Sequence, residues 1–289
     1  MTGLSVALST FAALTLSFAA SDTQAAEAAA PAIDKSNFNL FNPVPKENLR
    51  ELSTDRPDKT ESAYTVDAGH VQIEADVFSF AHDKATGTDS WAIAPVNLKL
   101  GLLKNVDLQT VVESYNHVTV KDPTTGFKTR QSGFGDVTSR LKINLWGNDG
   151  GSTAMALMPF VKAPTNQDHL GNNSVEGGLI LPLAIQLPAG WDMGLMTEFD
   201  FNRNDGRSGH HAEFVNTVTF GHDIVGNLGG YIEFFSLVSA ESGAPWVGTV
   251  DLGLTYGLTE NIQLDAGVNL GVTRSADDYN PFLGISFRF

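Results

Sequence analysis

The chain contains 289 residues, of which 42% are apolar and 18% are charged, and its formal net charge is −15. A negative charge of this size is repelled by a phosphate backbone, so the composition argues against a nucleic-acid-binding protein. The apolar share excludes a disordered chain, and the absence of cysteine excludes disulfide frameworks, thiol nucleophiles and cysteine-ligated zinc. Beyond the N-terminal segment, no apolar run is long enough for a membrane-spanning helix. A soluble protein or a β-barrel remains.

The first residues have the character of an export signal. Residues 4–20 (LSVALSTFAALTLSFAA) are apolar or small, and small residues suitable for cleavage follow them. This pattern is typical of a secretory signal peptide, although no Lys or Arg precedes the apolar run. We therefore predict a signal peptide over residues 1–26 and an exported mature protein.

The next segment differs from the rest of the chain. Pro43, Pro45 and Pro57 disfavour a continuous strand here, because proline cannot donate to a strand ladder. We expect residues 27–67 to form a periplasmic N-terminal extension, with a short helix around residues 46–51, and residues 68–289 to form the main domain.

Alternation with a period of two dominates residues 68–289. Across residues 262–272 every even position is apolar and every odd position is polar or glycine, and residues 137–145 and 191–201 are patterned in a similar way. One face of each predicted strand is therefore apolar and the other is polar. A soluble β-sandwich would show the same alternation, so this pattern alone does not distinguish a protein core from lipid.

Three further observations favour a membrane barrel. About twelve such segments occur, at the spacing of tilted membrane strands with connections. Short turns alternate with longer polar loops, among them those predicted over residues 82–90 and 119–132. The chain also ends on an apolar strand whose last residue is Phe289. We predict an all-β fold, a 12-stranded antiparallel transmembrane β-barrel in the outer membrane of a Gram-negative bacterium, with both ends in the periplasm.

A specific motif supports this interpretation. Residues 54–80 read TDRPDKTESAYTVDAGHVQIEADVFSF, which contains a TDRPD-x-T-E-S stretch followed by G-H-x-Q-I-E. This resembles the outer-membrane transporter-like family of phenol-degradation meta-pathway proteins. The resemblance implies a channel-like barrel linked to the uptake of aromatic compounds, and it implies no catalytic residues and no cofactor. Barrels of this kind are also understood to engage the barrel assembly machinery through a terminal aromatic residue, here Phe289.

The polar face of the strands is the first candidate site. Charges facing lipid would cost about 2–4 kcal/mol each for Lys or Arg at the midplane, so we expect them to line the lumen. Acidic side chains outnumber basic ones on this face, which favours passage of cations or neutral polar solutes. Alternatively, the same charges cross-link the strands and fill a narrow lumen. The predicted lumen residues are Glu74, Asp76, Lys99, Glu113, Arg140, Lys142, Glu198, Asp200, Glu233, Asp251, Asp265 and Arg288.

The second candidate site lies in the extension. Asp55, Arg56, Asp58 and Glu61 are close together in the TDRPDKTE motif. They could form a plug or a charged latch across the pore entrance. They could equally pin the extension to the lower rim of the barrel, with Pro57 fixing the direction of the chain.

Enzymatic motifs are absent from the sequence, and we expect no catalytic site, metal site or cofactor. His210 and His211 would point to opposite faces of a strand, which argues against a shared metal. The predicted function is passive passage of small solutes, including hydrophobic or aromatic ones. The alternatives are a non-conducting structural or adhesion barrel and, less favoured, a membrane-embedded hydrolase involving Ser208. The expected partners are outer-membrane lipid, the assembly machinery and small-molecule solutes, with no nucleic acid, and the expected state is a monomer.

Overall fold

The computed structural model describes residues 33–122, 124–204 and 208–289. The predicted signal peptide and the first residues of the predicted extension lie outside these ranges. The short 3-10 helices are η1 (Lys35–Asn37), η2 (Lys46–Asn48) and η3 (Pro188–Gly190). The strands are β1 (Val71–Asp83), β2 (Thr88–Ile93), β3 (Val96–Leu103), β4 (Val106–Val112), β5 (Tyr115–Lys121), β6 (Lys128–Gly133), β7 (Val137–Trp146), β8 (Thr153–Ala163), β9 (Glu176–Gln186), β10 (Trp191–Arg203), β11 (His210–Val225), β12 (Leu228–Ser239), β13 (Val247–Thr259), β14 (Ile262–Gly271) and β15 (Tyr279–Arg288).

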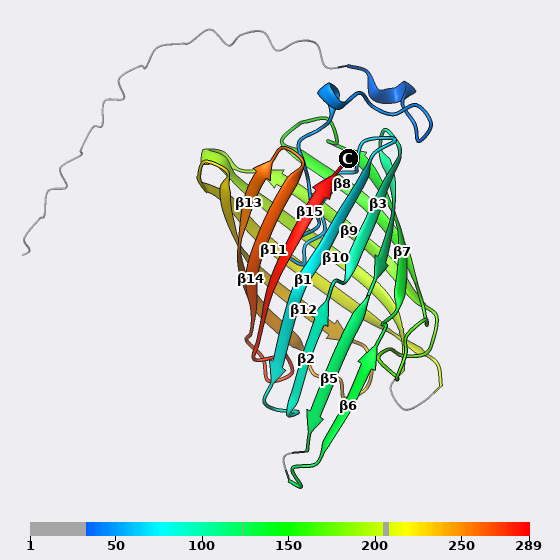
Figure 1. The fold of residues 1–289 in the computed structure, drawn as a ribbon, viewed down its shortest axis with the longest axis vertical. Coiled ribbons are helices and arrows are strands. Elements are labelled where there is room, and N and C mark those ends of the chain that lie inside the picture. The colour runs from blue at the N-terminus through cyan, green and yellow to red at the C-terminus, as the bar shows by residue number, and fades with distance from the viewer. Residues whose placement is uncertain (1–32, 123, 205–207) are drawn as a thin grey trace, which may run out of the picture. The chain divides into compact units, whose positions relative to one another are not determined.

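These strands form one closed antiparallel sheet (Figure 1). Neighbours in the sequence pair with each other along most of the wall, and β15 pairs with β1 to close it. Three pairs of short strands are halves of longer ones, namely β2 with β3, β4 with β5, and β6 with β7. Within the described ranges the wall therefore has twelve strands, which confirms the predicted 12-stranded barrel.

The interruption between β2 and β3 has a local cause. It falls at Ala94 and Pro95, where proline lacks the N–H that a continuous ladder needs and Ala94 takes a positive φ of 52°. The N-terminal part of β1, from Val71 to Ala75, consequently pairs with β3, and its C-terminal part, from Ser79 to Asp83, pairs with β2.

Two predicted loops are largely strand. β1 continues to Asp83 and β2 begins at Thr88, so only residues 84–87 form the first connection. β5 likewise runs to Lys121, and β6 begins at Lys128. The expectation of long loops over residues 82–90 and 119–132 was wrong, because a backbone ladder pairs polar residues as readily as apolar ones. The polar composition of these two segments indicates that their side chains contact water beyond the membrane, and it does not indicate that their backbone forms a loop.

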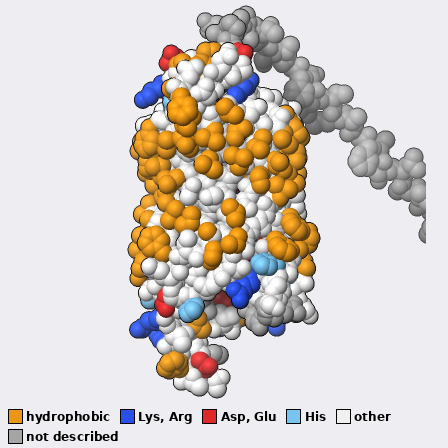
Figure 2. Space-filling view, turned by 90° about the vertical axis from the view of Figure 1, so that its right-hand side faces the viewer, with side chains coloured by type: hydrophobic (Ala, Val, Ile, Leu, Met, Phe, Trp, Pro, Cys, Tyr) orange, Lys and Arg blue, Asp and Glu red, His pale blue; other side chains and the backbone are white. Residues whose placement is uncertain are grey.

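The distribution of side chains is the reverse of that in a soluble protein. Large apolar residues such as Ile232 and Leu254 are 46% and 49% exposed, whereas Lys142 and Asp251 are fully buried. On the face that Figure 2 shows, apolar side chains form a broad band across the wall, and charged side chains gather beyond its ends. A soluble sandwich would bury its apolar faces instead. The wall is therefore built to face lipid, in agreement with the expected location in the bacterial outer membrane.

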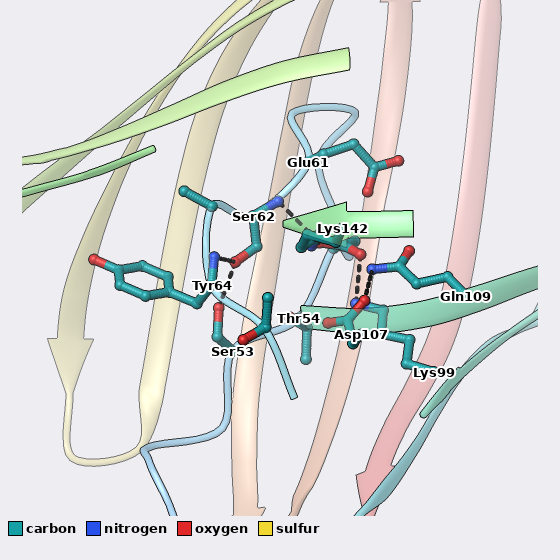
Figure 3. A network of polar contacts seen from close by, with 12 residues as sticks. Ser53, Thr54, Glu61, Ser62, Tyr64, Lys99, Asp107, Gln109 and Lys142 are labelled. Atoms are coloured by element: carbon teal, nitrogen blue, oxygen red, sulfur yellow. Dashed lines mark hydrogen bonds and ion pairs between the residues drawn. The ribbon is translucent and has the colours of Figure 1, made fainter. Parts of the chain in front are cut away.

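No helix in the described part of the chain is long and apolar enough to cross a membrane. The predicted helix around residues 46–51 is only the short turn η2, which is followed by extended chain at Leu49. Residues 53–66, here called the inner segment, then run among the inward-facing side chains of the barrel (Figure 3).

Because the apolar face of the wall contacts lipid, a charge placed on this face should lower the free energy of unfolding most near the middle of a strand and least near its end. Ile232 lies near the middle of β12 and faces outward, so Ile232→Arg should lower the free energy of unfolding in lipid vesicles by about 2–4 kcal/mol. Leu228→Arg, on the same face at the end of the strand, should cost only about 0–1 kcal/mol. Urea titration of both variants checks this. Equal effects at the two positions would contradict the assignment of this face to lipid.

Candidate functional site

The inner segment folds back on itself inside the barrel. The hydroxyl groups of Ser53 and Ser62 lie 2.6 Å apart, and the backbone N–H of Ser62 donates to Asp55 Oδ1 at 2.9 Å. The N–H of Tyr64 donates to the Ser62 hydroxyl at 3.2 Å. These contacts close a loop whose tip comprises residues 56–60, and Figure 3 shows this loop between the strands. The tip is thereby presented to the lumen wall on several sides.

A basic region of the wall holds the acid at the start of this loop. The Asp55 carboxylate lies 2.5 Å from Lys99 Nζ and 2.6 Å from Lys142 Nζ, and Lys99 also contacts Glu74. The side chains of Lys99, Lys142 and Asp55 are 2%, 0% and 5% exposed. Charges this deeply buried are stable only when they are paired, so Asp55 compensates two buried ammonium groups at once. Glu61 similarly forms an ion pair with Arg140 on β7.

An acidic region of the wall holds the basic residues of the tip. Arg56 contacts Asp76 on β1 and donates to Asp265 on β14 at 2.7 Å. Lys59 Nζ lies 3.0 Å from Asp251 Oδ2 on β13, and its backbone N–H donates to Glu233 Oε2 on β12 at 2.8 Å. The Thr60 hydroxyl also contacts Glu233.

The lumen is thus polarised across its width. Bases project from β3 and β7, and acids project mainly from β12, β13, β14 and β1, while the inner segment places residues of the complementary charge against each region. Eight predicted lumen residues are brought together around the inner segment. These are Glu74, Asp76, Lys99, Arg140, Lys142, Glu233, Asp251 and Asp265.

The other predicted residues lie elsewhere. Glu113 sits at the interruption between β4 and β5 and accepts from Asn116 at 3.5 Å. Glu198 and Asp200 lie on β10, two residues apart on one face. Arg288 is at the rim beside the extension, where it donates to the backbone carbonyl of Arg50 at 2.8 Å. Asp58, within the tip, lines a cavity beside it.

An apolar region of the inner wall was missed by sequence analysis. Met158, Ile180, Met196 and Val215 are buried together on β8 to β11, and Phe160, Phe235 and Leu237 pack against them. Their signal was present, since residues 153–163 (TAMALMPFVKA) and 176–186 (EGGLILPLAIQ) are apolar on both faces. A strand that is apolar on both faces is buried on both sides, here by lipid and by the lumen contents.

The attachment of the extension to the rim of the barrel was also missed by the sequence analysis. The buried carboxylate of Asp67 contacts Lys35 Nζ at 2.9 Å and Arg50 Nη1 at 3.1 Å. The His70 ring lies between the carbonyl oxygens of Val44, at 2.7 Å, and Phe289, at 3.0 Å. His70 belongs to the G-H-x-Q-I-E motif, which was the available signal. These contacts tie the extension to the seam where the barrel closes.

Two small cavities remain inside the barrel next to the tip. One of about 240 Å³ is lined by Lys59, Phe235 and Asn269 and reaches the loop after β14. The other, of about 220 Å³, is lined by Arg56, Tyr231 and Gln263 and reaches the turn between β11 and β12. Both are smaller than the roughly 300–1,000 Å³ of ordinary ligand pockets. The tip lies between a cavity on the side of the long loops and one on the side of the short turns.

His210 and His211, at the start of β11, are not arranged as a metal site. His210 faces outward and stacks on Phe201 at 5.0 Å, whereas His211 faces the other way and contacts Glu213 at 3.1 Å. The Ser174 hydroxyl lies 3.3 Å from His210 Nε2, on the exposed surface. Within the described residues, no group of three His or acidic side chains is placed to hold a metal ion.

Comparison with known proteins places the chain in a family. The family described as "Putative MetA-pathway of phenol degradation" matches residues 54–289, which include the whole barrel and all but the first residue of the inner segment. The chain belongs to this family. No match is found among curated proteins.

The solved structures that this family member is similar to include outer-membrane channels. The COG4313 outer membrane channel from Pseudomonas putida F1 is 13% identical, with a TM-score of 0.58, over 82% of this chain and 100% of that one. The NanC porin is 10% identical, with a TM-score of 0.46, over 74% and 98% of the two chains. The DcaP channel of Acinetobacter baumannii is 10% identical, with a TM-score of 0.36, over 76% and 95%. At these identities the likeness concerns the fold.

The buried pairing of Asp55 predicts how the inner segment is held. Asp55→Asn leaves two buried ammonium groups with less compensation, which costs about 3–5 kcal/mol. The inner segment should therefore leave the lumen more often, and tryptic cleavage after Lys59 in the folded protein should accelerate roughly a hundredfold or more. Glu47→Gln, an exposed change in the same extension, should leave the rate unchanged. An unaltered rate in Asp55→Asn would show that this pairing does not retain the segment.

Proposed function

We propose that the protein is a passive outer-membrane channel for small solutes, in which the inner segment acts as a plug that must shift for solutes to pass. The observation that carries this proposal is the complementary charge between the segment and the lumen wall. The segment occupies the lumen through ion pairs and hydrogen bonds to polar side chains, all of which water can replace when the segment moves. A core that had only to be filled could use apolar residues at lower cost.

The solutes are small molecules with an aromatic or otherwise apolar part. The inner wall offers an apolar region around Met158 and Met196 beside charged regions of both signs. Such a lumen suits a solute that carries an apolar body and a polar end. The description of the family, which refers to phenol degradation, points in the same direction. The charges of the plug also bear on selectivity, because its basic residues neutralise much of the acidic wall until the plug moves.

A disulfide lock tests the plug directly, because the chain has no cysteine of its own. The hydroxyl oxygens of Thr60 and Thr217 are 2.6 Å apart, so Thr60→Cys with Thr217→Cys should join the tip to β11. Oxidation should then suppress solute flux in liposome-swelling and planar-bilayer measurements, and reduction should restore it.

The matched control joins the plug to itself. Ser53→Cys with Ser62→Cys, whose hydroxyl oxygens are also 2.6 Å apart, should form a disulfide within the segment and leave it free to move as a unit. Flux should therefore be retained in the oxidised control. Equal flux through the locked and unlocked Thr60 variant would rule out gating by the segment. An absence of flux in every folded protein would instead support the non-conducting structural or adhesion barrel.

The preference for apolar solutes has its own measurement. Liposomes containing the channel should swell faster in L-phenylalanine than in L-serine, although phenylalanine is the larger molecule. Met196→Thr, which introduces a polar group into the apolar region, should reduce that ratio. A higher rate for serine in the wild-type protein would contradict the proposed solute class.

We draw further inferences about catalysis, about the mature chain and about its assembly. We infer that the protein is not an enzyme, since the His210 and Ser174 pair is exposed and no third group among the described residues orients it as a triad would require. We also infer that the mature chain starts near residue 27, that it functions as a monomer, and that Phe289 is the residue read by the barrel assembly machinery. Phe289 is 58% exposed and packs edge-on against Phe287 at 5.3 Å, which leaves it accessible at the end of β15.

A further inference from the structure

The outward face of β2 and β5 carries a cluster of rings at the edge of the apolar band. The Trp91 ring lies 5.1 Å from that of His117 and 5.5 Å from that of Tyr115. Aromatic rings of this kind collect at the level of lipid headgroups. Because long loops face the cell exterior in outer-membrane barrels, this cluster marks the headgroup level of the outer leaflet.

Three basic side chains continue the same face beyond the rings. Lys121 is four residues after His117 along β5, so both point to one side of the strand. Lys121 is directly opposite Lys128 in the register, and Arg130 is two residues further along β6. The hairpin of β5 and β6 therefore presents Lys121, Lys128 and Arg130 together, on the outward face and just above the headgroup level.

The positive charges of these three side chains are not neutralised by other residues in the described part of the chain. All three side chains are exposed, and none forms an ion pair with another residue of the described ranges. The adjacent acid, Asp122, uses its carboxylate to accept the N–H groups of Thr124 and Thr125 at 2.8 and 2.7 Å. Like charges directly opposite each other on two strands are destabilising. An external anion at this position would remove that penalty.

We propose that this basic face of the hairpin binds the phosphate groups of a phosphorylated glycolipid in the outer leaflet. Ammonium and guanidinium groups form charge-assisted hydrogen bonds with phosphate, and a planar guanidinium can do so in two places. The acyl chains of the same lipid would lie along the apolar wall beneath Trp91, which places both parts of the lipid on matching surfaces. The site is separate from the lumen and does not depend on the proposed channel activity.

The test measures how much lipid A the purified, folded protein retains, using native mass spectrometry. The wild-type protein should retain bisphosphorylated lipid A, and monophosphorylated lipid A should bind more weakly. A triple variant, Lys121→Ser with Lys128→Ser and Arg130→Ser, should lose at least tenfold in retention. The control Lys46→Ser with Arg274→Ser removes exposed bases from other parts of the chain and should bind as the wild type does.

Folding of each variant is verified by its altered gel migration before and after boiling. If the triple variant does not fold, the single variants Lys121→Ser and Arg130→Ser replace it, each with an expected loss of several-fold. Wild-type retention in the folded variants would overturn the proposal. Displacement of lipid A by phosphatidylglycerol or by inorganic phosphate at equal concentration would also overturn it, since either result would reveal a general anion site.

Discussion

The structure depends on one constraint, which is that a backbone crossing hydrocarbon must satisfy all its hydrogen bonds within the protein. The pairing of β15 with β1 meets this constraint by joining the last strand to the first, so that no sheet edge faces lipid. The orientation of every side chain follows, because alternate residues of a closed wall must point either to lipid or to the lumen. An apolar exterior and a polar interior are two results of the same closure.

Closure creates a second problem inside the barrel. The inward positions include buried groups such as Lys142 and Asp251, and a buried charge is costly unless it is paired. The wall supplies some of these partners itself, such as Glu74 for Lys99, but the ion pairs of Lys142 and Asp251 are made with the inner segment. The inner segment supplies the missing partners, with Asp55 against the bases and Lys59 against the acids. A segment of alternating charge is therefore suited to a lumen that is basic on one side and acidic on the other.

Much of this architecture could be predicted from the sequence. Period-two alternation located the wall strands, since lipid and lumen impose opposite demands on successive residues. The identity of the lumen residues followed from the same parity, but their partners did not. Parity places Asp265 on the inner face, yet only the three-dimensional path of the inner segment brings Arg56 to it. Lys59 was not predicted as a site residue for the same reason, although it lies inside the TDRPDKTE motif. The apolar region around Ile180 was visible as a strand without alternation, and it was not recognised because the polar strands set the expectation for all the others.

The contact of His70 with both Val44 and Phe289 has a consequence for how the molecule is made. One imidazole ring contacts both the extension that precedes the first strand and Phe289, the residue that follows the last strand. Synthesis delivers these two ends at opposite times, with the whole wall between them. The ring can make both contacts only after the last strand has paired with the first. The two contacts of His70 therefore form together only when the extension is bound and the barrel is closed. Closure of the barrel and placement of the extension are therefore completed at the same stage of assembly.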